Sequence, residues 1–299
     1  RRWPSQRLQR ASRAMPNVAA CIAAMQKAMP APAAGVVAAL APTGKLRAGI
    51  NLSNFLLVTS GPDTMPPVGV SPGMASALAS LLGVEVEYVG FPSPGAVADA
   101  AQDNVWDIGN IGAEPARAEY IRFTNAYCEI EATCLLRGDS PIAAFDAVDQ
   151  PGVRIATKNR AAFTLWLERN LKHAELVLFD SPDAAFDGFI DQSIEVLAGL
   201  RPRLLEDVAR LPGARLLPEK FTAIQQAIGT PSARDVTGSD FLQQFVESAL
   251  QHGLAEALIE QHLANPGLRR NVVEAARTRT VREFGSVRRF ELLFDQLEQ

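Results

Sequence analysis

The sequence has little of what metal and cofactor sites need. Only three of its 299 residues are cysteine and three are histidine, and no two of them stand at the spacing of a metal site. Neither the GxGxxG pattern of dinucleotide-binding turns nor the GxxxxGK[ST] phosphate loop occurs. We therefore expect no metal and no cofactor.

Residues for nucleophilic catalysis are also scarce. The three histidines, His173, His252 and His262, lie near predicted helix ends, where an imidazole commonly meets solvent or the helix dipole. Cys128 and Cys134 lie six residues apart in one extended segment, which favours the same side of a strand over a disulfide. We expect a binding protein rather than an enzyme.

No apolar run reaches the ~18 residues of a membrane-spanning helix. The first 50 residues hold eight basic residues and no acid, and basic residues before an Ala-rich run leave a remnant signal peptide open. Because no aromatic residues alternate with these charges, we expect no nucleic-acid partner. Residues 1–43 are predicted to be a flexible leader with one helix from Asn17 to Met29.

From Lys45 onward short apolar runs alternate with helical segments. Ser71-Pro72 and Ser93-Pro94 are helix-start signals, and Gly83 is a helix-stop signal. Such spacing predicts a parallel sheet with helices on both faces. The predicted strands are Leu46 to Asn51, Val84 to Val89 and Val105 to Ile111.

A second α/β series follows, with strands predicted at Val153 to Thr157, Leu176 to Phe179 and Ile194 to Leu197. Two extended segments, Glu131 to Arg137 and Pro218 to Gln225, separate the series and should run side by side as crossovers between two lobes, each with its own sheet. The predicted division is residues 44–133 and 223–262 for lobe 1, 134–222 for lobe 2, and 263–299 for a helical tail that packs on the body or on a partner.

The stretch from Trp106 to Tyr127 carries the clearest functional signal. A short apolar strand ends at Gly112, and Pro115 suits the first position of a helical turn that carries Arg117. Free backbone N–H groups with a guanidinium one turn on make an anion pocket. The alternative for Arg117 is an ordinary surface ion pair with Glu114 or Glu119.

These residues resemble the bacterial extracellular solute-binding family, the polar-amino-acid type that serves ABC importers. Asp107, Gly112, Arg117, Phe123-Thr124 and Tyr127 carry the resemblance, together with LRAGINLSN, GVSPGMASALASLLGVEVEYV, GVRIAT and FTAIQQAIG. It extends over roughly 44–262. The family resemblance implies a two-lobed α/β fold of the type II periplasmic-binding kind, a monomer in the periplasm, and the membrane subunits of an ABC importer as partners.

By this resemblance Arg117 would clamp a ligand carboxylate in a cleft between the lobes. The other residues expected to contact the ligand are Asn51, Asn54, Phe91, Gly112, Ala113, Asn159, Arg160, Ala161 and Arg201. For the polar members of the loops, ordinary capping is the alternative.

The ligand class stays open between an amino acid and another organic anion. Family members that bind amino acids usually carry an acid just past the strand that ends near Leu200, and this chain has Ala198-Gly199-Leu200-Arg201 there. Two alternatives to transport remain, a dehydratase-like enzyme on the same fold, with Glu114 as its nearest acid, and a ligand-sensing domain.

Overall fold

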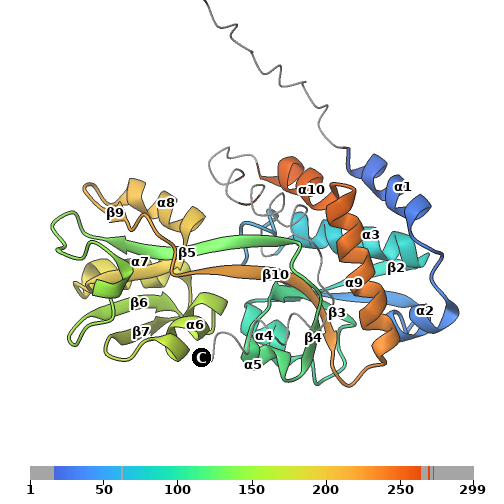
Figure 1. The fold of residues 1–299 in the computed structure, drawn as a ribbon, viewed down its shortest axis with the longest axis horizontal. Helices are drawn as coiled ribbons and strands as arrows, with labels where there is room; N and C mark the ends of the chain where they lie inside the picture. Colours follow the sequence, from blue (N-terminus) through green and yellow to red (C-terminus); the bar gives the residue numbers. More distant parts are fainter. Residues whose placement is uncertain (1–16, 62, 264–268, 270–271, 273–299) are drawn as a thin grey trace, which may run out of the picture.

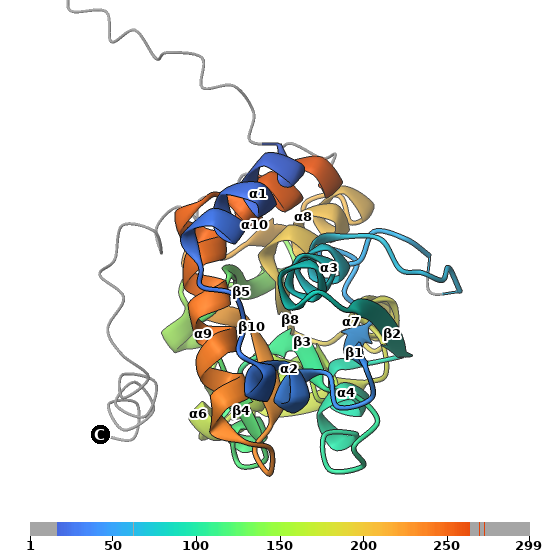
Figure 2. The ribbon, with the colours of Figure 1, turned by 90° about the vertical axis from the view of Figure 1, so that its right-hand side faces the viewer.

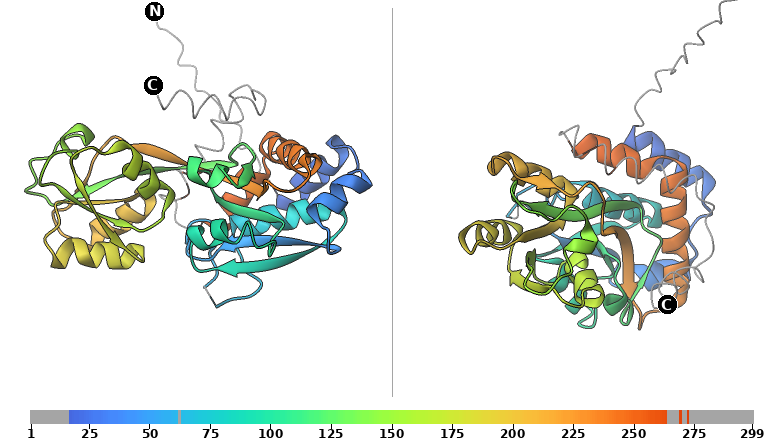
Figure 3. Two further views of the ribbon diagram at one scale, coloured as in Figure 1. Left: turned by 90° about the horizontal axis from the view of Figure 1, so that it is seen from below. Right: turned by 60° about the vertical axis from the view of Figure 1, so that its left-hand side comes forward.

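The computed structural model describes residues 17–61 and 63–263, together with residues 269 and 272. It shows two α/β lobes joined by long strands (Figure 1). The crossing strands are β5 (Cys128–Leu136) and β10 (Thr222–Pro231). Figure 3 shows them between the two lobes in a view from below. The prediction of a two-lobed α/β fold is confirmed.

The first lobe is built on parallel strands with helices on both faces. Leu46, Ala48 and Ile50 of β1 belong to one core cluster, whereas Gly49 faces Trp106 on the other side. Helix α3 contributes to the first cluster and α4 to the second. This lobe contains β1 (Lys45–Asn51), β2 (Glu85–Phe91), β3 (Ile108–Gly112), β4 (Ile121–Phe123), α3 (Val70–Leu82), α4 (Pro94–Asp99), α5 (Pro115–Ala118), α9 (Val236–Gln251) and α10 (Leu254–His262).

The second lobe repeats this plan. On β6 and β8 consecutive residues face opposite ways, so Ile155 and Val196 pack toward α6 while Ala156 and Leu197 pack toward α7. The lobe contains β6 (Arg154–Lys158), β7 (Glu175–Phe179), β8 (Val196–Leu200), β9 (Arg215–Leu216), the 3-10 helix η1 (Phe145–Ala147), α6 (Ala162–Asn170), α7 (Pro182–Asp191) and α8 (Arg201–Arg210).

The two crossing strands pair antiparallel, with Thr222 opposite Ala132 and Gln226 opposite Cys128. The expected side-by-side crossovers are therefore present. One detail differs from the expectation of two separate sheets, because the ladder runs without a break in the order β2-β1-β3-β10-β5-β8-β6-β7. The ladder is continuous because the two crossing strands are long enough to reach the sheets of both lobes. Strand β10 also pairs with β3 and β4, and β5 also pairs with β8 and β9.

The described part of the leader is ordered structure rather than a flexible segment. Helices α1 (Val18–Ala28) and α2 (Ala34–Leu40) pack against α9 and α10 of the first lobe (Figure 2). Met25 and Leu40 have no exposed surface, and both belong to the main core cluster. The prediction failed for residues 17–43 because the apolar partner surface on α9 and α10 lies about 200 residues further along the chain.

The expected start signal at Ser71-Pro72 lies inside a helix rather than at its cap. Helix α3 begins one residue before Ser71, with Gly69 as its N-terminal cap at φ +148°, and the Ser71 side chain is buried with its hydroxyl 3.0 Å from that of Tyr127.

Most of the tail, 263–299, lies outside the described residues. Of the three tail residues described, Leu263 and Val272 are buried in the core of the first lobe.

Candidate functional site

A cleft of about 800 Å³, including its open mouth, lies between the lobes. It sits at the carboxyl ends of the strands, where ligands of open α/β sheets bind. Asn51 ends β1, Gly112 ends β3, Lys158 ends β6 and Leu200 ends β8. The lining residues from the first lobe and the crossing strand β10 are Asn51, Ser53, Asn54, Phe55, Pro94, Gly112, Arg117, Ile224 and Gln226.

Arg117 is the most buried cation of the cleft, with 3% of its surface exposed. Pro115 opens α5 and so fixes the turn that carries this side chain. Its Nη1 donates to the carbonyl of Gly112 at 2.7 Å and its Nη2 donates to the carbonyl of Arg160 at 3.0 Å. A guanidinium has five N–H donors, so most of them remain for a ligand.

Burial also determines the electrostatics of Arg117. Desolvation lowers its pKa to about 10. Neither neighbour that it hydrogen-bonds is an acid, and within the described part of the chain it forms no ion pair. The alternative of an ordinary surface ion pair is therefore wrong for this residue.

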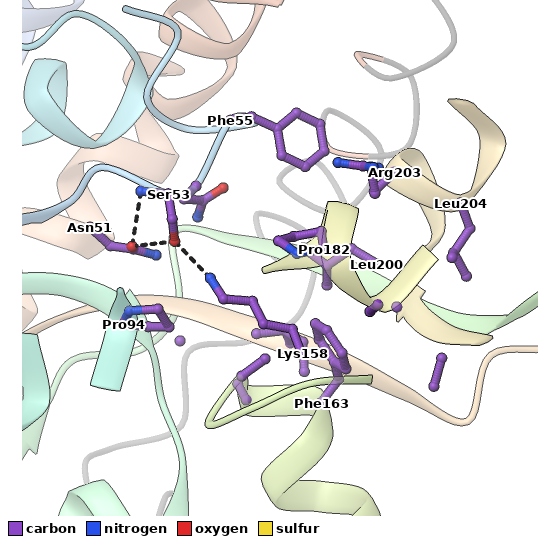
Figure 4. Close-up of a pocket in the computed structure, with 18 of the residues that line it drawn as sticks. Asn51, Ser53, Phe55, Pro94, Lys158, Phe163, Pro182, Leu200, Arg203 and Leu204 are labelled. Carbon is purple, nitrogen blue, oxygen red and sulfur yellow. Dashed lines mark hydrogen bonds between the residues drawn. The ribbon is translucent and has the colours of Figure 1, made fainter. Parts of the chain in front are cut away.

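Lys158 is a second cation in the cleft, and sequence reasoning missed it. It ends β6 with 8% of its surface exposed. Its Nζ donates to Ser53 Oγ across the cleft at 2.8 Å, and Ser53 Oγ donates to Asn51 Oδ1 at 2.8 Å (Figure 4). Burial first, and then the charge of Arg117, lower the pKa of Lys158. Its place at the carboxyl end of a predicted parallel strand was the signal that could have identified it.

The part of the cleft inside the second lobe is mostly apolar. Figure 4 shows Pro182, Leu200 and Leu204 beyond Lys158. The lining residues of this lobe are Lys158, Ala161, Ala162, Phe163, Pro182, Ala185, Leu197, Ala198, Gly199, Leu200, Arg203, Leu204 and Asp207.

Asp207 is the acidic side chain in the lining, and two arginines already contact it. Arg203 Nε lies 3.2 Å from each carboxylate oxygen, and Arg210 Nη1 lies 3.0 Å from Oδ1. Burial raises the pKa of Asp207, and the arginines act in the opposite direction. The local charge of this carboxylate is therefore compensated within α8.

Ion pairs join the two lobes beside the cleft. Arg160 Nη2 lies 2.6 Å from Asp99 Oδ1, and both side chains are at least half exposed. Arg169 Nη1 lies 2.6 Å from Glu114 Oε2, where the glutamate is buried. Burial raises the pKa of Glu114, although Arg169 opposes the shift. Glu114 stands outside the cleft lining.

The structure brings half of the expected ligand contacts together. The residues that line the cleft are Asn51, Asn54, Gly112, Arg117 and Ala161. Gly112 stands where a side chain would not fit, since a Cβ there would lie 2.8 Å from Ile224 and 3.2 Å from Ala162. Its small size allows the two lobes to pack closely rather than opening space for a ligand.

The other expected contacts are outside the cleft lining. Phe91 packs against the apolar cluster around Trp106. The backbone N–H of Ala113 donates to Gln225, and that of Asn159 donates to Phe179. These three residues serve the packing and strand pairing within each lobe.

The two remaining expected residues, Arg160 and Arg201, are engaged in other interactions. Arg160 pairs with Asp99, so its backbone carbonyl rather than its side chain reaches Arg117. Arg201 Nε donates to Glu131 at 2.8 Å, and its other nitrogens donate to the carbonyls of Leu217 and Pro218. Arg201 therefore holds the crossing segments together.

Two lobes, paired crossing strands and a cleft between them define a solute-binding protein of the type II periplasmic-binding class. Residues 52–272 match the model of the bacterial extracellular solute-binding proteins, family 3, and the chain belongs to this family. A search of curated proteins gave no match. In the described residues, no helix is both long enough and apolar enough to cross a membrane.

Solved structures support the fold. An ArgBP mutant from T. maritima has a TM-score of 0.62 at 16% identity, covering 77% of this chain and 100% of that one. An amino acid ABC transporter substrate-binding protein from Streptococcus pneumoniae, bound to L-arginine, has a TM-score of 0.61 at 18% identity, covering 76% and 97%. An ancestral amino acid-binding protein, described as a precursor of cyclohexadienyl dehydratase, has a TM-score of 0.60 at 20% identity, covering 74% and 96%.

Proposed function

We propose that this chain is the substrate-binding component of an ABC-type importer and binds a small carboxylate-bearing solute in the cleft. The observation that carries the proposal is Arg117, a guanidinium that is buried at the junction of the lobes and forms no ion pair in the described chain, although the charge of nearby Glu114 acts on it. A buried charge of this kind is stable only with compensating interactions, and a bidentate carboxylate supplies them.

Closure of the lobes would complete the site. Arg117 belongs to the first lobe, and Lys158 and the apolar wall belong to the second. We assign residues 44–133 and 223–262 to lobe 1, join residues 17–43 to it, and assign 134–222 to lobe 2. A monomer that closes on its solute presents a distinct shape to the membrane subunits of an importer in the periplasm.

A thermal-shift screen against amino acids, organic acids and polyamines tests this function. A ligand at 100 times its dissociation constant adds about 2.7 kcal/mol to the free energy of unfolding. For a protein of this size the melting temperature then rises by roughly 5–10 °C. The absence of a shift with every carboxylate at millimolar concentration contradicts the proposed function.

A dehydratase-like enzyme is the second candidate. Its support is the buried Asp207 in the cleft, with a raised pKa, together with the neighbour described as a dehydratase precursor. Turnover of prephenate-like substrates by the purified protein, followed by product absorbance, separates catalysis from binding. Loss of that turnover in Asp207→Asn would identify Asp207 as the catalytic acid.

A sensing domain would bind a ligand without any effect on transport.

A further inference from the structure

We propose that the ligand is a carboxylate with an uncharged substituent at its α carbon and an apolar tail, such as a 2-hydroxy or 2-oxo acid, rather than a zwitterionic amino acid. This inference rests on the proposed function. It follows from the charges and the shape of the cleft.

The first argument is the charge of the polar end. Arg117 and Lys158 both line the cleft, are both almost completely buried, and form no ion pair within the described chain. Two adjacent cations favour an anion and repel a ligand ammonium in a poorly solvated site.

The second argument is that the lining holds no unpaired carboxylate to compensate the charge of an ammonium group. Asp207 already contacts Arg203 and Arg210. Asn51 Oδ1 accepts from the backbone N–H and the hydroxyl of Ser53. Ser53 and the amides of Asn51 and Gln226 are neutral groups, which can hydrogen-bond a hydroxyl or a carbonyl oxygen but do not compensate the charge of an ammonium.

The third argument is the wall of the second lobe. Beyond Lys158 the lining is formed by Ala185, Leu197, Ala198, Gly199, Leu200 and Leu204. The polar side chains at this end, Arg203 and Asp207, are paired with each other. An apolar tail would fill this volume, and each buried methylene should improve affinity about fourfold.

Isothermal titration with matched compounds at pH 7 tests the inference. We expect 2-hydroxy-4-methylpentanoate to bind at least about thirtyfold more tightly than leucine, which differs only in the α substituent. Lactate, which has the same head without the tail, should bind more weakly by at least tenfold. Equal or tighter binding of leucine, or of lactate, overturns the inference while the proposed function stands. If no solute of the broad screen binds, the proposed function fails and this inference fails with it.

A charge reversal gives a second test that does not depend on absolute affinity. Lys158→Glu places an acid where the ammonium of leucine would need one, so the preference for the hydroxy acid over leucine should fall by at least a hundredfold or reverse. Lys172→Glu is the matched control, because Lys172 is an exposed lysine of the same lobe and does not line the cleft. Lys158→Met, which adds no charge, serves if Lys158→Glu does not fold, and it should reduce the preference at least tenfold. An unchanged preference in the folded variant overturns the inference.

Discussion

At Arg117 the physical requirements of folding and of binding differ. Its guanidinium is almost fully buried, and burial lowers its pKa to about 10, so the charged form is less favourable in the folded protein than in water. The hydrogen bonds to the carbonyls of Gly112 and Arg160 compensate part of this cost. Such an unfavourable charge is expected where a ligand of opposite charge completes the site.

Replacement of Arg117 tests this requirement. Arg117→Lys should weaken carboxylate binding by about a hundredfold or more, because an ammonium cannot reproduce the planar fork and one lost partner of a buried pair costs on the order of 3–5 kcal/mol. Isothermal titration measures the loss. Arg154→Lys, at the partly exposed start of β6 and paired with Glu195, is the control and should leave affinity unchanged, because Arg154 does not line the cleft. Equal effects at both positions would place the site elsewhere.

The lowered pKa of Lys158 predicts that the affinity for a carboxylate ligand depends on pH. Its pKa lies below the ordinary value of 10.5, and that of Arg117 is about 10. As the pH rises from 7 toward 10, loss of these protons should weaken carboxylate binding. In Lys158→Met only the Arg117 part should remain, so the loss of affinity over this pH range should be smaller than in the native protein. Titrations at several pH values check this, and an affinity independent of pH up to 10 would count against both cations.

In the ligand-free protein the lowered pKa of Lys158 has the opposite effect, because it makes the free energy of unfolding rise with pH. A lysine with a lowered pKa binds fewer protons when folded than when unfolded, so the free energy of unfolding should rise with pH between the folded pKa and 10.5. Urea unfolding without ligand, compared between the native protein and Lys158→Met, measures this contribution. The variant should show a smaller increase in that pH window, because only the lowered pKa of Arg117 then contributes.

At the scale of elements, α5 and α6 are joined across the cleft by Arg169 and Glu114, while α4 is joined to the start of α6 by Asp99 and Arg160. The two pairs differ in exposure. An exposed pair contributes about 0–1 kcal/mol, whereas a buried carboxylate that loses its partner is costly.

These pairs should therefore affect ligand affinity unequally. Arg160→Ala should weaken binding less than about fivefold, and Arg169→Ala should weaken it by about tenfold or more, because closing the lobes would then bury Glu114 without its ion-pair partner. Titration of both variants at low and at 0.5 M salt checks which substitution weakens binding more. Salt should reduce mainly the effect of Arg160→Ala, because the Arg160–Asp99 pair is exposed. The reverse order would contradict this account of the closed state.

Helix α1 is expected to be a structural part of the first lobe. Met25→Ala should lower the free energy of unfolding by about 2–5 kcal/mol, because the side chain has no exposed surface and its loss leaves a cavity. Val18→Ala on the same helix is the control, since Val18 is only partly buried, and it should cost less than half as much. Similar small effects at both sites in urea unfolding would indicate that α1 is not needed.

On the scale of the whole molecule, only the antiparallel strands β5 and β10 cross between the lobes in the described chain. A hinge of two strands permits rotation of packed lobes with little loss of core contact. Small-angle scattering should show a larger radius of gyration for the ligand-free protein than for the protein saturated with ligand. Arg169→Ala without ligand should shift toward the open form. Identical scattering curves with and without ligand would exclude closure as the binding step.

The sequence by itself determined most helices and strands of the two lobes and their order, because the signals that start and stop them are local. Ser93-Pro94 and Ser181-Pro182 open α4 and α7, and Gly83 ends α3 in the left-handed conformation. The position of Arg117 in the cleft followed from the strand, the turn at Gly112 and the resemblance of neighbouring residues to a known family.

Only the tertiary structure decided which side chains meet. Lys158 and Ser53 are 105 residues apart, and no local pattern relates them. Arg160 and Arg201 have the right chemistry for an anion site, but their side chains are already paired with Asp99 and Glu131. The docking of α1 and α2 and the unbroken ladder also depend on partners far along the chain. Local conformation follows from nearest neighbours, whereas pairing and burial depend on contacts that exist only after the lobes have packed.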